Sequence, residues 1–197
     1  MLAEAGFDLV HAFDTAAVAH EFPFLADPAR RRGLLVGNTR ALWPRFLAAR
    51  RADPELLAAS DPLDLYTERT VAHAFPGERV WLAHAQYDGA WIPIQRLAAA
   101  VGFAHLAPSH LSIHPTYGPW FALRGVIALV GDPPATRTTC APCPCDTECT
   151  DQLARAIASQ DPRDWIALRD SCNVGRNHRY GDDQLLYHYT KDRALLR

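Results

Sequence analysis

The sequence predicts a domain of mixed structure, either α/β or α+β, in which short strands alternate with helices. Apolar runs of strand length are separated by segments with the spacing of an amphipathic helix. No internal repeat and no linker divides the chain. With 197 residues, of which 49% are hydrophobic, the chain is long enough to bury one good core. We therefore expect one domain over residues 1–197.

Three apolar runs predict strands. Residues 34–36 (Leu-Leu-Val) predict a short buried strand, and residues 80–83 (Val-Trp-Leu-Ala) predict a central strand. Residues 126–130 (Val-Ile-Ala-Leu-Val) give the strongest signal, because β-branched side chains pack well on a pleated surface. Two prolines, at 133 and 134, end this strand.

Two helices are predicted in the first half of the chain. Asn38 and Thr39 carry side-chain oxygens that are suited to cap a helix running through residues 41–47. Pro62 predicts the start of a second helix over residues 62–74, since proline at the first helical position loses no needed donor.

Further helices are predicted towards the C-terminus. Residues 94–101 form an alanine-rich helix that ends at Gly102. The chain from Asp151 predicts two helices separated by a loop at residues 173–181.

Composition and charge exclude several classes of protein. A formal net charge of −2 gives little of the electrostatic field that captures nucleic acid. No apolar run is long enough to span a bilayer, and residues 1–10 lack the basic region of a secretion signal. Clustered cysteines are typical of a reducing compartment. We therefore expect a cytoplasmic protein without a nucleic-acid or membrane partner.

Three histidines crowd one predicted loop. His105, His110 and His114 lie between the predicted helix ending at Gly102 and the strand at Val126. Three imidazoles can ligate a metal, but no carboxylate or cysteine joins them at a ligand spacing. The pattern alone is therefore a weak indication of a metal site.

The segment 112–125 favours two interpretations equally. His114 precedes a proline and is held extended, while Gly118 allows a tight change of backbone direction. Trp120 and Phe121 add flat apolar area, and Arg124 adds a cation. Such a loop can line one wall of a pocket for a large planar ligand. It can equally be a well-packed proline turn with two core aromatics.

The run Ile-His-Pro-Thr-Tyr-Gly-Pro-Trp-Phe-Ala-Leu-Arg-Gly-Val at 113–126 resembles the signature segment of the cobalamin-processing family, the vitamin B12 decyanases and dealkylases. Weaker similarity covers most of the chain. It includes residues 5–9, similar to the first strand of the family, and the segments 38–44, 61–64, 163–165, 169–170 and 179–180.

This resemblance implies a flavin-nitroreductase-like α+β fold, with a central, mostly antiparallel sheet flanked by helices. It also implies that the protein binds cobalamin base-off, with the nucleotide tail folded away from cobalt. The upper axial ligand is then removed, either by reductive loss of cyanide or by transfer of an alkyl group to a thiol such as glutathione.

The resemblance also implies roles for individual residues. His114 is expected at the corrinoid site as the catalytic residue, and two arginines are expected to hold the anionic thiol. Guanidinium groups bind carboxylates through paired hydrogen bonds, although each arginine could equally lie on a solvent-exposed helix face. The expected corrinoid-binding residues are His114, Pro115, Tyr117, Gly118, Trp120 and Phe121, and the two arginines are Arg155 and Arg193.

A cysteine-rich loop at residues 140–149, inserted before the C-terminal helices, departs from the human type of this family. Its spacing, C-x2-C-x-C-x3-C, is one residue short of the run that holds clusters in bacterial ferredoxins. An iron–sulfur cluster, a zinc ion, or a redox-labile loop without metal are the alternatives. The candidate ligands are Cys140, Cys143, Cys145, Cys149 and, from a separate loop, Cys172.

Three functions follow as hypotheses. The first is reductive removal of the upper ligand of cobalamin, and the second is a corrinoid carrier without turnover. The third is a flavin-dependent reductase that uses FMN or another flavin. The expected partners are a small corrinoid and a thiol or flavin electron donor, with a homodimer as a further expectation.

Overall fold

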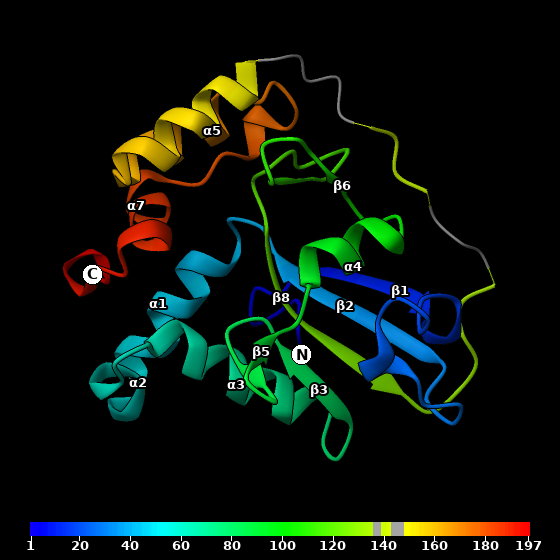
Figure 1. Ribbon diagram of the computed structural model, residues 1–197. Helices are drawn as coiled ribbons and strands as arrows, with labels where there is room; N and C mark the ends of the chain where they lie inside the picture. The colour runs from blue at the N-terminus through cyan, green and yellow to red at the C-terminus, as the bar shows by residue number, and fades with distance from the viewer. Residues whose placement is uncertain (136–138, 143–147) are drawn as a thin grey trace.

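A four-stranded antiparallel sheet lies at the centre of the computed structural model, which describes residues 1–135, 139–142 and 148–197 (Figure 1). The strands follow the order β1-β2-β8-β3, so the first two are neighbours that follow one another in the chain, and β8, from later in the chain, lies between β2 and β3. Their bounds are Leu9–Asp14 for β1, Arg32–Asn38 for β2, Arg79–Leu82 for β3 and Ala122–Leu129 for β8.

Both faces of the sheet are covered by helices. Successive residues of the two inner strands point to opposite sides, so each face carries apolar side chains that helices cover. Leu35 and Val126 pack into one core with residues of α4 (Ile94–Ala100). Their neighbours Val36 and Ile127 pack into the other core, with residues of α1 (Leu42–Ala52), α3 (Pro62–Ala74) and α7 (Asp182–Thr190). The α+β class with a flanked antiparallel sheet is confirmed.

Short elements complete the described structure. Two hairpins follow β3 and α4, and three helices form the C-terminal part, with α5 at the far edge from the sheet (Figure 1). The remaining elements are α2 (Pro54–Ala58), β4 (Gln86–Tyr87), β5 (Ala90–Trp91), β6 (His105–Leu106), β7 (Ser112–Ile113), α5 (Glu148–Ser159), α6 (Pro162–Asp170), and 3₁₀ turns at Thr15–Ala17, Pro23–Leu25, Arg176–His178 and Arg193–Leu195.

Two strand predictions are corrected. The run at 80–83 is not a central strand, because β3 lies at the edge of the sheet and pairs only with β8. The expected first strand at 5–9 is also wrong, since residues 2–6 form turns and β1 begins only at Leu9. The strands predicted at 34–36 and 126–130 do lie within, or almost wholly within, β2 and β8.

The C-terminal part contains three α-helices among its described residues rather than two. Gln160 adopts a left-handed conformation at φ 56°, which ends α5. Asp161 then caps the next helix by accepting from the backbone N–H of Arg163, and Pro162 occupies its first position. The stop at Gln160 therefore separates α5 from α6, whereas hydrophobic periodicity alone predicts one helix there.

The predicted side-chain cap of α1 is wrong, because Ala41 is the N-cap residue and no side chain caps this helix. The hydroxyl of Thr39 accepts from the backbone N–H of Ala41 at 3.2 Å, and Asp8 in turn accepts from Thr39. Asn38 does not cap the helix, because its side chain is buried and its Oδ1 accepts from Arg124 at 2.7 Å. A charged donor is a stronger partner than a backbone N–H.

No helix in the part of the chain that the structure describes is long and apolar enough to cross a membrane.

Candidate functional site

A β-bulge places an arginine at the junction of two cavities. Val36 pairs with Gly125 and Gly37 pairs with Leu123, so Arg124 is an extra residue in β8. A bulge redirects the side chain of its extra residue. The Arg124 guanidinium, held through its Nε by Asn38, lines the cavities on both sides of it.

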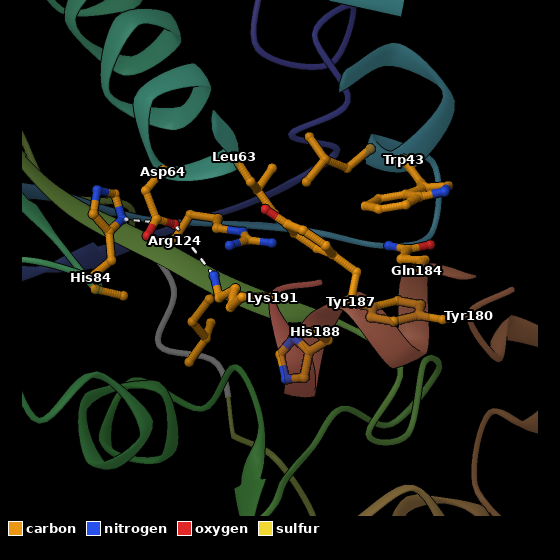
Figure 2. Close-up of a pocket in the computed structure, with 13 residues that line it drawn as sticks. Trp43, Leu63, Asp64, His84, Arg124, Tyr180, Gln184, Tyr187, His188 and Lys191 are labelled. Carbon is orange, nitrogen blue, oxygen red and sulfur yellow. Dashed lines mark ion pairs between the residues drawn. The ribbon is translucent and has the colours of Figure 1, made fainter. Parts of the chain in front are cut away.

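The two cavities share a partition. Leu123, Arg124 and His188 line both of them. One, the Tyr187 cavity, has a volume of about 210 Å³ and is lined by these three residues and by Leu42, Trp43, Leu63, Asp64, Ala83, His84, Tyr180, Gln184, Tyr187 and Lys191 (Figure 2). The other, the Phe121 cavity, has a volume of about 290 Å³ and is lined by the same three and by Ile94, Gln95, Leu111, Ser112, Pro119, Phe121, Ala122 and Arg169.

Asp64 is the carboxylate of the Tyr187 cavity. Its Oδ1 lies 3.8 Å from Nδ1 of His84 and 3.9 Å from Nζ of Lys191, and Figure 2 marks both ion pairs. Burial, assisted by Asp61 and Asp64, raises the pKa of Tyr187 to about 12. The Tyr187 hydroxyl therefore stays protonated at neutral pH. The two ion pairs bring together α3, the turn after β3 and the end of α7 at one charged side of the cavity.

A neutral histidine lies between the cations of the partition. The guanidinium of Arg169 on α6 approaches His188 on α7, with Nη2 3.2 Å from Nε2. Burial holds the pKa of His188 well below its usual range, and Arg169, Arg124 and Lys191 lower it further. A neutral imidazole whose Nε2 accepts a hydrogen bond from the Arg169 guanidinium fits this geometry.

Several buried donors around the partition lack a partner among the described residues. Nε and Nη1 of Arg169 are two of them, and the hydroxyls of Ser112 and Tyr180 are two more. Burial raises the pKa of Tyr180 to about 12, so its hydroxyl remains a donor. A buried donor without an acceptor is costly. The site is therefore suited to a ligand rich in acceptors.

His114 lies beside this site in an aromatic cluster and lines neither cavity. Its Nδ1 accepts from the backbone N–H groups of Thr116 and Tyr117 at 3.1 and 3.3 Å. Its ring packs 4.9 Å from Phe103 and 6.0 Å from Phe121, measured between centroids. Burial lowers the pKa of His114 to about 4, with repulsion from His11 and His178 adding to the effect.

The loop that follows His114 doubles back on itself. Backbone hydrogen bonds of 2.9 and 2.8 Å join His114 and Gly118 in both directions. Pro115 is exposed at the tip, and Tyr117 is half-buried with its ring 4.8 Å from His178. These observations favour the packed-turn interpretation for the tip of the loop.

The two aromatic residues after the loop separate. Phe121 lines its cavity, so the structure brings this predicted residue to a pocket wall. Trp120 is 1% exposed and packs with Tyr180 in the C-terminal cluster, with the Arg179 guanidinium 5.7 Å from its ring. Trp120 therefore lines neither of the two cavities.

The two arginines expected to bind a thiol lie on the surface. Arg155 is exposed on α5, and Arg193 is exposed in the last 3₁₀ turn, where Nη2 donates to the carbonyl oxygen of Leu57 at 2.7 Å. Neither lines the cavities around Arg124. The sequence indicates Arg124 only as one of two equal interpretations of its segment, and it does not indicate Arg169 or His188, which only tertiary packing brings together.

The cysteine prediction falls partly outside the described residues, because Cys143 and Cys145 are not among them. Cys149 and Cys172 are buried, and Cys140 is partly exposed. Within residues 1–135, 139–142 and 148–197, no group of three or more histidine, cysteine, aspartate or glutamate side chains is arranged to hold a metal. This also excludes the described histidines at 105, 110 and 114 as such a group.

The fold is similar to that of a solved structure from C. elegans, the B12-trafficking protein CblC, described as a homologue of human MMACHC. The TM-score is 0.70 and the identity 17%, over 99% of this chain and 90% of that chain. No protein-family model matches the sequence, and no curated protein matches it. The expected fold, α+β and nitroreductase-like, is thus confirmed.

Proposed function

We propose that this protein binds cobalamin base-off and removes its upper axial ligand. The observation that carries the proposal is the agreement of two independent signals. The fold is similar over nearly the whole chain to that of a B12-trafficking protein. The segment 113–126, which resembles the signature of the cobalamin-processing family, supplies Phe121 and Arg124 to the walls of the cavities.

The chemistry needs little covalent help from the protein. In decyanation, cobalt(III) accepts one electron, the cobalt–carbon bond breaks, and cyanide leaves with the bonding pair, which gives cobalt(II). In dealkylation, a thiolate attacks the alkyl carbon and the bonding pair stays on cobalt, which gives cobalt(I) and a thioether. The protein's part is to exclude water and to hold the corrinoid without its lower base.

The three cations around His188 suit the departure of an anion. Cyanide leaves as an anion in the reductive reaction, and Arg124, Arg169 and Lys191 are the cations around His188. Fixed positive charge in a partly dry site stabilises developing negative charge more than water does. This electrostatic contribution would accelerate loss of the upper ligand.

Binding requires the partition to open. Each cavity is smaller than the roughly 300–1,000 Å³ of pockets that hold drug-sized ligands, and a corrinoid is larger than such ligands. Leu123 belongs to β8, an inner strand of the sheet, whereas His188 belongs to α7. We infer that α7 moves away from β8 and merges the two cavities when a corrinoid binds.

The electron donor is proposed to be a reduced flavin or a thiol, and an iron–sulfur cluster on the cysteine-rich loop is an alternative. The concentration of cysteines favours the reducing cytoplasm as the place of this activity. In decyanation the electron can reach cobalt from a diffusing reductant, whereas in dealkylation the thiolate must reach the alkyl carbon itself.

The test is anaerobic incubation of the purified protein with cyanocobalamin and reduced flavin, with free cyanide as the readout. The proposal predicts cyanide release that depends on the protein and saturates with cobalamin. A base-off spectral shift without release would identify a carrier and contradict the enzymatic part. Glutathione with methylcobalamin, followed by detection of the thioether, tests dealkylation in the same way.

A further inference from the structure

Two arginines line the Phe121 cavity, and no acidic residue among the described lining residues accompanies them. Arg124 enters it from the bulge of β8, and Arg169 enters it from α6. The residues that the structure describes as lining it include no aspartate and no glutamate. A buried cation is normally paired with a carboxylate or with several acceptors. This cavity therefore carries positive charge that its own wall does not neutralise.

Arg169 is the less satisfied of the two guanidiniums. The residue is 8% exposed, and one of its nitrogens, Nη2, contacts the neutral His188. Nε and Nη1 are buried without an acceptor among the described residues. The rings of Tyr180 and Tyr189 lie 6.0 and 5.6 Å from its guanidinium carbon and hold it by cation–π contact. Its position is thus fixed by these two rings and by a hydrogen bond to the side chain of Tyr189, while Nε and Nη1 are left open.

Arg124 has a neutral partner. Its Nε donates to the amide oxygen of Asn38, which brings no negative charge. The carboxylate that acts on it most closely is Asp64, but Asp64 lines the other cavity and is shared with His84 and Lys191. Ser112 adds a third open donor to the Phe121 cavity, because its hydroxyl is buried and unpaired in the described structure.

We propose that the Phe121 cavity contains an oxyanion subsite built from Arg169, Arg124 and Ser112. Two guanidiniums and one hydroxyl match a phosphate or a carboxylate, whose several oxygens accept paired hydrogen bonds. A neutral amide or hydroxyl would leave the net positive charge of the cavity in place. The subsite differs from the surface arginines Arg155 and Arg193 to which the thiol was assigned by resemblance.

Two ligands of the proposed function carry such a group, and for their identity this inference rests on that function. Cobalamin has a phosphodiester in its nucleotide tail, and a thiol cosubstrate such as glutathione has carboxylates. Both would place an oxyanion beside the corrinoid site. The existence of the subsite, in contrast, is tested with the protein alone.

The first test measures the melting temperature of the purified protein in inorganic phosphate and in acetate at constant ionic strength. We expect both anions to raise it, and Arg169→Met to weaken their affinity by about tenfold or more, which is the scale of losing charged hydrogen bonds. Arg163→Met is the matched control, because Arg163 is exposed on the same helix. A variant that keeps the wild-type response to both anions would overturn the subsite.

The second test identifies the natural oxyanion with three ligands. If it is the phosphodiester, Arg169→Met weakens cobalamin binding by about tenfold and leaves cobinamide, which lacks the tail, unaffected. If it is the carboxylate, the variant weakens glutathione and leaves both corrinoids unaffected. Failure of the proposed function is distinguishable, because wild-type protein would then bind inorganic oxyanions but neither corrinoid.

A measurement on unmutated protein keeps the inference testable if the variant does not fold. The ¹⁵N resonances of the arginine Nε groups report their hydrogen bonds directly. Titration with phosphate should shift the signals of Arg169 and Arg124 together, with one affinity, and leave that of Arg163 in place. Signals of Arg169 and Arg124 that do not move would contradict the subsite.

Discussion

Gly118 and Val174 are in backbone contact. A Cβ atom added to Gly118 would lie 1.9 Å from the carbonyl oxygen of Val174, and Gly118 has a left-handed φ of 57°. The contact is reciprocal, since a Cβ atom on Gly175 would lie 2.3 Å from the carbonyl carbon of Tyr117. The loop before β8 and the loop after α6 therefore interlock through two glycines, which fixes α6 relative to the sheet.

Gly118→Ala should be strongly destabilising. A left-handed alanine costs about 1–2 kcal/mol by itself, and the clash with a backbone oxygen adds to this cost. Urea denaturation should show a lower free energy of unfolding by more than about 2 kcal/mol. The matched control is Gly181→Ala, where φ is −61° and an added Cβ meets nothing within 4 Å. Equal losses in the two variants would contradict the interlock.

The role of His114 can be divided by two substitutions. In His114→Asn, the amide oxygen can replace Nδ1 as the acceptor for the backbone N–H groups of Thr116 and Tyr117, whereas His114→Ala removes this acceptor. If the imidazole acts only in the loop, the asparagine variant keeps wild-type corrinoid affinity and the alanine variant loses about 1–2 kcal/mol of stability.

If His114 acts at the corrinoid, both variants weaken binding or slow ligand removal several-fold, and the asparagine variant does so without loss of stability. The proposed catalytic role predicts this second pattern. Wild-type cobalamin binding and turnover in His114→Asn would contradict it.

Stability should fall as the pH drops from about 6.5 towards 4. The pKa of His114 is about 4 in the folded protein, against 6.5 for an ordinary histidine. Between these values the unfolded chain binds a proton that the folded protein does not, so acidification favours unfolding. His188, whose pKa is also lowered, acts in the same direction.

His114→Asn should therefore reduce the slope of the free energy of unfolding against pH in this window, with His188 left to supply part of it. The control is His73→Asn, because His73 is exposed on α3. A slope that is the same in His114→Asn as in wild type would show that His114 is not held neutral by the fold.

The cysteine-rich loop predicts bound metal. Four cysteines lie within residues 140–149, and thiolates brought together repel one another unless a metal neutralises them or they stay protonated. Prolines at 142 and 144 reduce the ordering cost of a site. We expect iron with acid-labile sulfide after anaerobic purification, and its loss in Cys149→Ser. Zinc without iron would indicate a structural site instead, and protein without metal would contradict both.

Elements with strong local signals could be predicted from the sequence. β8 has a run of β-branched and apolar residues, and α4 ends at Ala100, just before the expected stop at Gly102, which has a left-handed φ of 72°. The position of β3 could not be predicted, because an apolar run does not reveal how many neighbours a strand will have. The edge position depends on β8 returning from a distant part of the chain.

The candidate site was predictable only where one segment contributes it. Phe121 and Arg124 both come from 113–126, and the Arg-Gly pair within an apolar strand is a signal for the bulge. The pairing of Arg169 with His188 joins two helices through packing that no spacing encodes. The distance of Arg155 from the cavities likewise follows from the position of α5, which local sequence does not determine.

The most direct test of the central claim is a spectroscopic titration of the protein with cyanocobalamin or methylcobalamin. We expect the visible bands to shift to those of the base-off form and to saturate with protein. Cobinamide, which has no lower base to lose, should bind without such a shift. Corrinoid bands of both cobalamins that stay unchanged at saturating protein would contradict the proposal that this protein binds cobalamin base-off.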